Sequence, residues 1–446
     1  MKLIKNAKLE KKVVNILFEE KILKISESPI SEESCSEVFD AKGFLVLPGC
    51  LDAHVHFNDP GFTHKEDFFT GTSAAAAGGV TTIIDMPCTS LPPVTTTQAL
   101  KTKLDVIEPK AIVDFALWGG IRGNNISEDE INNLHNAGVA GFKMYAVSGM
   151  ETFKALNYQK IASILKDFDG SDILFGFHAE DRGVIQEALA KIPKKDLKRW
   201  QSYVPSRPKK AEIVAVEQIL DRMSKNRVHF VHISTAGATQ RILAAKKAGK
   251  DVTLETCPHY LAFCQDDYAQ LLGKLKTAPT VKYKEDKDFL RKTLIDGFID
   301  FVATDHAGCN YQKEKDLEDF SKVYCGIPGI ETMVLYIIDE FFLKGKISYK
   351  RLTKILSENQ AKRFRLYPQK GAIQIGSDAD FTIVNLQKHH IFDETKLNCM
   401  GKYSPFDGKK FHCQIERTIV RGRSVFTNSE GLKIDGGYGR FVRRQT

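Results

Sequence analysis

The chain has 446 residues, 42% of them hydrophobic, which is enough for one large core and a small second domain. The formal net charge of +8 is spread along the chain without interleaved aromatic residues, so we expect no nucleic-acid partner. No apolar run reaches the ~18 residues of a membrane span, and the N-terminus has no signal-peptide pattern. Nine cysteines, an odd number without close pairing, indicate free thiols and a cytoplasmic protein.

The first 48 residues carry short alternating runs, at Val13–Phe18 and Lys21–Ile25. Such runs predict β hairpins without helices. The segment is too small for a good core of its own, so it needs a partner elsewhere in the chain.

Residues 49–372 repeat one pattern, a β-rich run followed by a helix-compatible stretch such as Glu128–Ala137 or Ala236–Ala248. Counted from just before this region, eight β-rich runs occur, at Phe44–Pro48, Val80–Met86, Ala111–Trp118, Gly141–Tyr145, Ile173–His178, Val228–Ile233, Val252–Thr256 and Phe301–Asp305. Eight apolar strands alternating with helices predict an α/β fold, a (β/α)8 TIM barrel. The alternative is an open doubly wound sheet, but no Gly-x-Gly-x-x-Gly turn follows the first run.

Residues 373–446 return to the pattern of the N-terminal segment, with runs at Ala379–Asn385, Arg417–Gly422 and Arg423–Phe426. We expect the two ends to pair into one small β-sandwich, which brings the termini together beside the barrel.

Metal-capable side chains close several of the barrel strands. His54 and His56 stand two apart and therefore face the same way on a strand. The same end of other strands presents further candidates, namely Lys143, His178, His232 and Asp305. Functional residues of such barrels sit at the carboxyl ends of the strands, and two divalent ions that share a ligand would explain the whole set.

The remaining histidines give weaker signals. His259 follows the seventh strand and is a candidate for the barrel mouth, and His306 is a candidate for orienting Asp305. The others lie in polar or outward contexts and are expected to be solvated: His64, His135, His229, His389, His390 and His412.

These residues resemble those of the cyclic amidohydrolases, the family of dihydroorotases, allantoinases and hydantoinases. The likeness runs from about Pro48 through the barrel into the C-terminal β region. Its motifs stand at Pro48–His56, Gly71–Thr82, Gly141–Met144, Phe177–Glu180, Gly329–Thr332, Tyr367–Gly371, Gly376–Asp380 and Lys402–Gly408.

The resemblance implies a role for each candidate ligand. His54, His56 and Asp305 would bind one ion, and His178 and His232 the other. A carbamate on Lys143, formed with carbon dioxide, would bridge the two. A bridging hydroxide would attack the amide carbonyl, and Asp305 would carry its proton to the leaving nitrogen. Zinc suits these ligands, though manganese or cobalt would fit too. The family often forms homodimers or homotetramers.

The positions that contact substrate separate the branches of the family. Where dihydroorotases carry substrate-contacting side chains, this chain has Asn58, Cys88, Ala278 and Cys309. Ser148 stands where D-hydantoinases place a tyrosine. Other motifs resemble allantoinases and L-hydantoinases, and backbone groups of Cys325 and Gly326 are candidates for binding the substrate amide.

We therefore expect an enzyme that opens a small cyclic amide, an allantoin- or hydantoin-like ring. Two alternatives stay open, a dihydroorotase and a non-catalytic binding protein. Arg122 or Arg207 could supply the cation that a dihydroorotase needs. Filled ligand positions argue against the binding protein.

Overall fold

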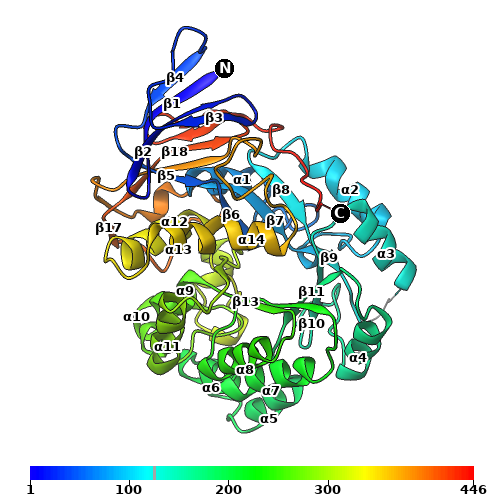
Figure 1. Cartoon of the computed structure of the whole chain (residues 1–446). Coiled ribbons are helices and arrows are strands. Elements are labelled where there is room, and N and C mark those ends of the chain that lie inside the picture. Colours follow the sequence, from blue (N-terminus) through cyan, green and yellow to red (C-terminus); the bar gives the residue numbers. More distant parts are fainter. Residues whose placement is uncertain (124–126, 446) are drawn as a thin grey trace.

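The computed structural model describes residues 1–123 and 127–445, and Figure 1 shows its two parts, a ring of parallel strands wrapped by helices and a β-sheet beside it. The ring is a (β/α)8 barrel. Its strands are β6 (Cys50–Val55), β7 (Val80–Asp85), β8 (Asp114–Leu117), β9 (Gly119–Gly120), β10 (Phe142–Tyr145), β11 (Leu174–His178), β12 (Arg227–Phe230), β13 (Val252–Thr256) and β14 (Phe301–Val302).

Every neighbouring pair in the ring is parallel. Only Trp118 separates β8 from β9, so these two segments act as one strand and the ring has eight. Between the last strand and the first, Val55 and His306 form a parallel bridge. The backbone N–H of His56 donates to the His306 carbonyl at 2.8 Å. These contacts bring the ends of β6 and β14 together.

One strand assignment was wrong. Phe44–Pro48 was counted as the first barrel strand, but β5 (Leu45–Pro48) pairs antiparallel with β15 (Phe381–Asn385) in the second sheet. The first barrel strand is β6, which begins after Gly49. A Cβ at Gly49 would lie 2.1 Å from the Thr81 hydroxyl, so the chain can pass between the two sheets only without a side chain there.

Helices cover the outside of the ring. The larger ones are α1 (Phe68–Ala77), α2 (Thr97–Ile107), α3 (Glu128–Ala137), α4 (Tyr158–Asp167), α5 (Arg182–Ala190), α7 (Lys209–Leu220), α8 (Ala236–Lys247), α11 (Lys284–Ile295) and α12 (Ile330–Ile337). Shorter ones are α6 (Tyr203–Ser206), α9 (Pro258–Ala262), α10 (Tyr268–Leu271), α13 (Tyr349–Thr353) and α14 (Asn359–Arg363). Local chemistry starts many of them, since side chains such as Asp67, Thr96 and Ser127 accept from free N–H groups of the first turn. The two predicted helices, α3 and α8, are confirmed.

The second sheet is built from both ends of the chain. It contains β1 (Lys2–Leu9), β2 (Lys12–Phe18), β3 (Ile22–Ser26), β4 (Glu37–Asp40), β5, β15, β18 (Gln414–Val420), β19 (Arg423–Thr427) and β20 (Gly431–Leu432). The order β20-β19-β18-β15-β5-β1-β2-β3, with β4 on β1, joins the N-terminal half to the C-terminal half at β5 and β15. A small separate core that includes Phe18, Phe381 and Ile419 fills it. The pairing of the two ends was predicted, while the domain boundaries at residues 48 and 373 stay a prediction. A two-stranded piece, β16 (His390–Ile391) with β17 (Lys410–Phe411), lies apart from this sheet.

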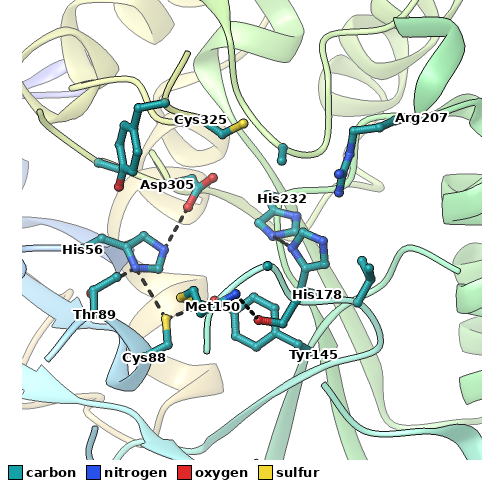
Figure 2. Close-up of a pocket in the computed structure, with 16 residues that line it drawn as sticks. His56, Cys88, Thr89, Tyr145, Met150, His178, Arg207, His232, Asp305 and Cys325 are labelled. Atoms are coloured by element: carbon teal, nitrogen blue, oxygen red, sulfur yellow. Dashed lines mark hydrogen bonds and ion pairs between the residues drawn. The ribbon is translucent and has the colours of Figure 1, made fainter. Parts of the chain in front are cut away.

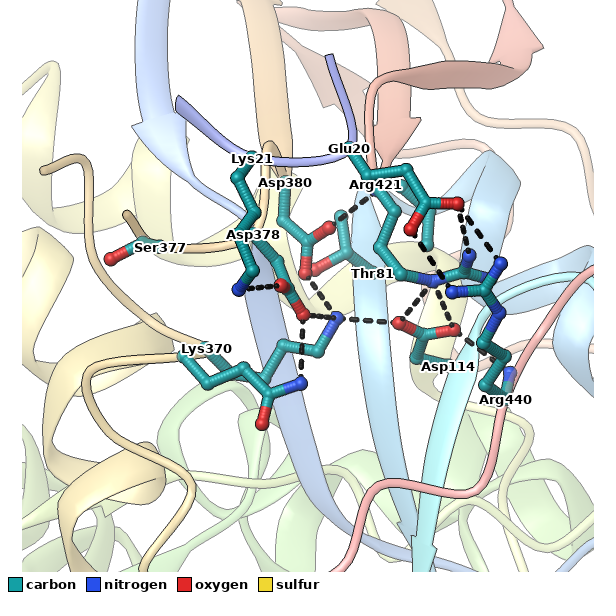
Figure 3. A network of polar contacts seen from close by, with 12 residues as sticks. Glu20, Lys21, Thr81, Asp114, Lys370, Ser377, Asp378, Asp380, Arg421 and Arg440 are labelled. Carbon is teal, nitrogen blue, oxygen red and sulfur yellow. Dashed lines mark hydrogen bonds and ion pairs between the residues drawn. The ribbon is translucent and has the colours of Figure 1, made fainter. Parts of the chain in front are cut away.

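A cluster of charged side chains joins the sheet, the barrel and the C-terminal tail (Figure 3). We call it the clasp, and its residues are Asp114, Lys370, Asp378, Asp380, Arg421 and Arg440. The Lys370 ammonium contacts Asp114 at the start of β8, Asp380 at 2.8 Å and Asp378 at 3.1 Å. Arg421 pairs with the same Asp114. The three carboxylates lie close enough for a cation, and Lys370 already provides that charge. Burial alone would lower the pKa of Lys370, but the carboxylates raise it.

Beyond β20 the tail runs back over the barrel. The Arg440 N–H donates to Asp114, and the Val442 N–H donates to the Phe115 carbonyl.

All nine cysteines are free thiols within the described part of the chain. Among the described residues, we found no helix with the length and apolar composition to cross a membrane.

Candidate metal centre

The predicted ligands lie in parallel strands or just after them, at one mouth of the ring. His54 lies in β6 and His56 follows it; Lys143 lies in β10 and His178 ends β11. His232 and Asp305 come just after β12 and β14, and both have left-handed backbones, with φ of 40° and 52°. Such values are uncommon outside glycine and cluster at functional sites. A cavity of about 310 Å³ opens above most of these residues (Figure 2).

The first cluster joins His54, His56 and Asp305. Both Nε2 atoms lie 3.1 Å from Asp305 Oδ1, and one ligand atom of each residue lies within 4.8 Å of the others. The other nitrogen of His54, Nδ1, lies 2.6 Å from the buried carboxylate of Glu255 and donates to it. A neutral His54 that donates from Nδ1 presents a lone pair on Nε2 to the Asp305 oxygen, and a cation between these two acceptors would satisfy both.

The second cluster joins His178 and His232. His178 Nδ1 and His232 Nε2 face each other at 3.0 Å. Nε2 of His178 lies 3.0 Å from Glu180, whose carboxylate is paired in turn with Arg207. Burial lowers the pKa of both histidines, which favours the neutral imidazole that a metal needs.

Lys143 lies between His56 and His178 in sequence order and is fully buried. Among the described residues, its ammonium nitrogen has no hydrogen-bond partner, and the aromatic ring of Tyr145 lies 4.9 Å away. Burial lowers its pKa. A neutral amine is the form that reacts with carbon dioxide, so the environment of Lys143 fits a carboxylated lysine. The whole set could hold two divalent ions.

The predicted substrate positions divide into two groups. Cys88, Ser148, Ala278 and Cys325 line the cavity. The other three do not: Asn58, Cys309 and Gly326.

Each of these three is engaged elsewhere. Asn58 donates from its side chain to the His56 carbonyl, with φ of 58°. Tyr403, from the C-terminal region, donates to the Gly326 carbonyl at 3.0 Å and lies 3.4 Å from the Cys309 sulfur.

Sequence reasoning missed several residues of the site. The cavity is also lined by Thr89, Tyr145, Val147, Gly149, Met150, Ala307 and Tyr324, and by Arg207, which the sequence had offered as a candidate cation. The Tyr145 hydroxyl lies 3.1 Å from the Cys88 sulfur. Tyr145 stands two residues after Lys143 and so shares its side of the strand, a signal that was available.

Two expectations for the other histidines were wrong. His229 was expected to be solvated, but it is fully buried and its Nε2 lies 3.0 Å from Glu255. His306 was expected to orient Asp305, but its ring contacts Glu66 and the Ile330 N–H. His259 is buried and does not line the cavity described above.

Comparison with known proteins agrees with this geometry. The sequence profile of the family described as "Amidohydrolase family" matches residues 45–425. An allantoinase of Rubrobacter xylanophilus is 36% identical over 94% of this chain and 91% of its own length. An L-hydantoinase of Paenarthrobacter aurescens is 34% identical over 93% of this chain and 91% of its own. A solved structure, the L-hydantoinase (dihydropyrimidinase) from Arthrobacter aurescens, superposes with a TM-score of 0.94 over 99% of both chains at 31% identity.

Proposed function

The chain belongs to the amidohydrolase family, and we propose that it hydrolyses the ring amide of an allantoin- or hydantoin-like substrate at a two-metal centre. The observation that carries this proposal is the cluster at the cavity in which Nε2 of both His54 and His56 lies 3.1 Å from Asp305 Oδ1. A neutral imidazole nitrogen and a carboxylate oxygen are both good ligands for a divalent metal ion. Relatives named allantoinase and L-hydantoinase, matched over more than nine-tenths of the chain, support the cyclic amide as substrate.

The ligand assignment follows the two clusters. His54, His56 and Asp305 would hold one ion, and His178 and His232 the other. Lys143, carboxylated by carbon dioxide, would contribute to both. Imidazole and carboxylate ligands suit zinc. When bound, such ions lower the pKa of water and polarise the carbonyl oxygen of the amide.

Asp305 carries the proton. Burial would raise the pKa of this carboxyl, but the neighbouring histidines hold it well below its ordinary value, so it is ionised and can accept a proton. In the reaction the oxygen of one water bonds to the amide carbon, and the ring C–N bond breaks. Asp305 takes a proton from the water and returns it to the leaving nitrogen. The product is an open chain with a new carboxyl group, which releases the second proton of the water to solvent and becomes a carboxylate.

Charge in the cavity favours a neutral ring over dihydroorotate. Arg207 is the one arginine among the described residues that line the cavity, and its guanidinium is already paired with Glu180. Arg122 donates to the Thr152 carbonyl and does not line the cavity. A substrate carboxylate would therefore be desolvated without a free cation, which costs several kcal/mol. Neither alternative function is favoured by the relatives described above.

A substrate panel tests the proposal. Allantoin, 5-substituted hydantoins, dihydrouracil and dihydroorotate would be compared by kcat/KM, first with zinc and then with manganese. We expect a five-membered ureide or hydantoin ring to be opened and dihydroorotate to be turned over poorly. A dihydroorotate value about tenfold or more above the others, a gap of ~1.4 kcal/mol in transition-state binding, would overturn the substrate assignment and make Arg207 the first residue to mutate.

A further inference from the structure

A chain of four side chains lies in the barrel interior and ends at the first metal-ligand cluster. Thr253 and Glu255 are two apart on β13 and share one side of it, and His229 is opposite Thr253 on β12. The Thr253 hydroxyl lies 2.9 Å from His229 Nδ1, and His229 Nε2 lies 3.0 Å from Glu255 Oε2. Oε1 of Glu255 lies 2.6 Å from His54 Nδ1. His54, His229 and Glu255 are fully buried.

The chemistry of a carboxylate fixes where the protons are in this chain. Both oxygens of Glu255 face ring nitrogens, Oε1 that of His54 and Oε2 that of His229, and an ionised carboxylate can only accept. His54 must then carry its proton on Nδ1, and His229 must carry its proton on Nε2. The other nitrogen of His54, Nε2, faces Asp305 and is available to a metal ion when the ring is neutral.

Glu255 also contacts the second cluster. The backbone N–H of His232 donates to the same Oε1 atom at 3.2 Å. His232 has a left-handed backbone, with φ of 40°, which is unfavourable for a residue with a Cβ and needs support from its surroundings. One carboxylate therefore holds the ring of a ligand in the first cluster and the backbone of a ligand in the second.

We propose that Glu255, itself oriented by His229, is the positioning residue of the metal centre: it sets the tautomer of His54 and holds His232 in place. Glu255 contacts neither the cavity nor the reacting atoms, so it acts only through its neighbours. Carboxylates behind metal-ligating histidines orient the ring and raise its basicity, and their loss weakens metal binding. The inference rests on the proposed function, because it requires that His54 and His232 bind metal.

A matched control exists in the same chain. Glu212, on α7, is a second buried glutamate, and it accepts from the Ser234 N–H and from the hydroxyls of Ser234 and Thr235. It supports the loop that follows His232 but makes no contact with a histidine in these hydrogen bonds. Glu212→Gln therefore measures the cost of removing a buried charge from this region.

The experiment is competition for Zn²⁺ between a chelator and the metal-free full-length protein, for wild type, Glu255→Gln and Glu212→Gln. A glutamine at position 255 has one accepting oxygen where the carboxylate has two, so at least one of the contacts with His54 Nδ1, His229 Nε2 and the His232 N–H loses its acceptor. In Glu255→Gln we expect the Zn²⁺ affinity of at least one of the two binding steps to fall by about 10- to 100-fold. In Glu212→Gln we expect the Zn²⁺ affinity of both steps to stay within about threefold of wild type. Equal affinities for Glu255→Gln and wild type, or an equal loss in both variants, would overturn the inference.

A second pair of variants leaves Glu255 intact, in case Glu255→Gln does not fold. His229→Leu removes one partner of the carboxylate, and His229→Gln offers an amide N–H in its place. We expect weaker Zn²⁺ binding in His229→Leu and recovery in His229→Gln; identical affinities would contradict the role of Glu255. If the wild-type chain binds fewer than two Zn²⁺ ions, the proposed function itself is contradicted. If the wild type binds two ions and the variants have the same Zn²⁺ affinity, only this inference is contradicted.

Discussion

Asp305 has the two properties that a proton carrier at a metal centre needs, a fixed position and access to substrate. Its Oδ1 lies 3.1 Å from Nε2 of both His54 and His56, and its side chain is 12% exposed, toward the cavity. The histidines are less exposed than Asp305. The carboxylate is thus the group of this cluster best placed to exchange a proton with a bound ring.

Asp305→Asn separates metal binding from proton transfer. The amide oxygen can still contact a metal ion, but the side chain cannot take up a proton at neutral pH. We expect the variant to retain at least one ion, by elemental analysis, and to keep less than about a tenth of the wild-type kcat, a loss of more than ~1.4 kcal/mol in transition-state stabilisation. A faster variant would show that another group carries the proton.

At the scale of single elements, sequence periodicity located the barrel strands because their apolar runs are short and end in polar residues. The strand that carries His54 shows where sequence periodicity fails to assign a strand to the correct sheet. Leu45–Pro48 and Cys50–Val55 are both fully buried, so composition alone cannot assign the first to one sheet and the second to another. That assignment depends on pairing with β15, more than 300 residues away.

The candidate ligands could be chosen from the sequence, but the residues that contact and support them could not. A histidine at the end of an apolar strand is a local signal. His229 lies between Val228 and Phe230, and the partner that makes its burial favourable, Glu255, comes from the next strand. Likewise, Cys309 and Gly326 are held by Tyr403 from the C-terminal region. Such contacts follow from tertiary packing.

At the scale of the whole molecule, the clasp ties together segments from most of the chain. Asp114 belongs to the barrel, Asp380 precedes β15 of the sheet, and Arg440 belongs to the tail. Lys370 is fully buried and is the ammonium group that contacts both Asp114 and Asp380. Without its ammonium group, the buried carboxylates of Asp114 and Asp380 would lose a neutralising positive charge. Leaving buried charges unpaired strongly destabilises the folded state.

Lys370→Met tests this role of the clasp. We expect the free energy of unfolding to fall by about 3–5 kcal/mol, the usual cost of removing one partner of a buried ion pair. Denaturant titration of the full chain would show it as a lower midpoint. Lys362→Met is the control, because Lys362 forms an exposed pair with Glu358 one helical turn away, and its loss should cost about 0.5 kcal/mol or less. Equal midpoints for the two variants would mean that the clasp does not stabilise the fold.

If two metal ions and Lys143 together make the active centre, activity depends on both. The experiment is to titrate metal-free protein with Zn²⁺ in bicarbonate buffer while following hydrolysis of the best substrate. Activity should rise until about two equivalents per chain are bound, the stoichiometry of a two-metal site. Lys143→Ala should stay inactive along the same titration unless a short carboxylic acid is added to replace the carbamate. Full activity with one ion per chain or fewer would show that the centre does not need two metal ions, and a fully active Lys143→Ala without added acid would show that it does not need a carboxylated Lys143.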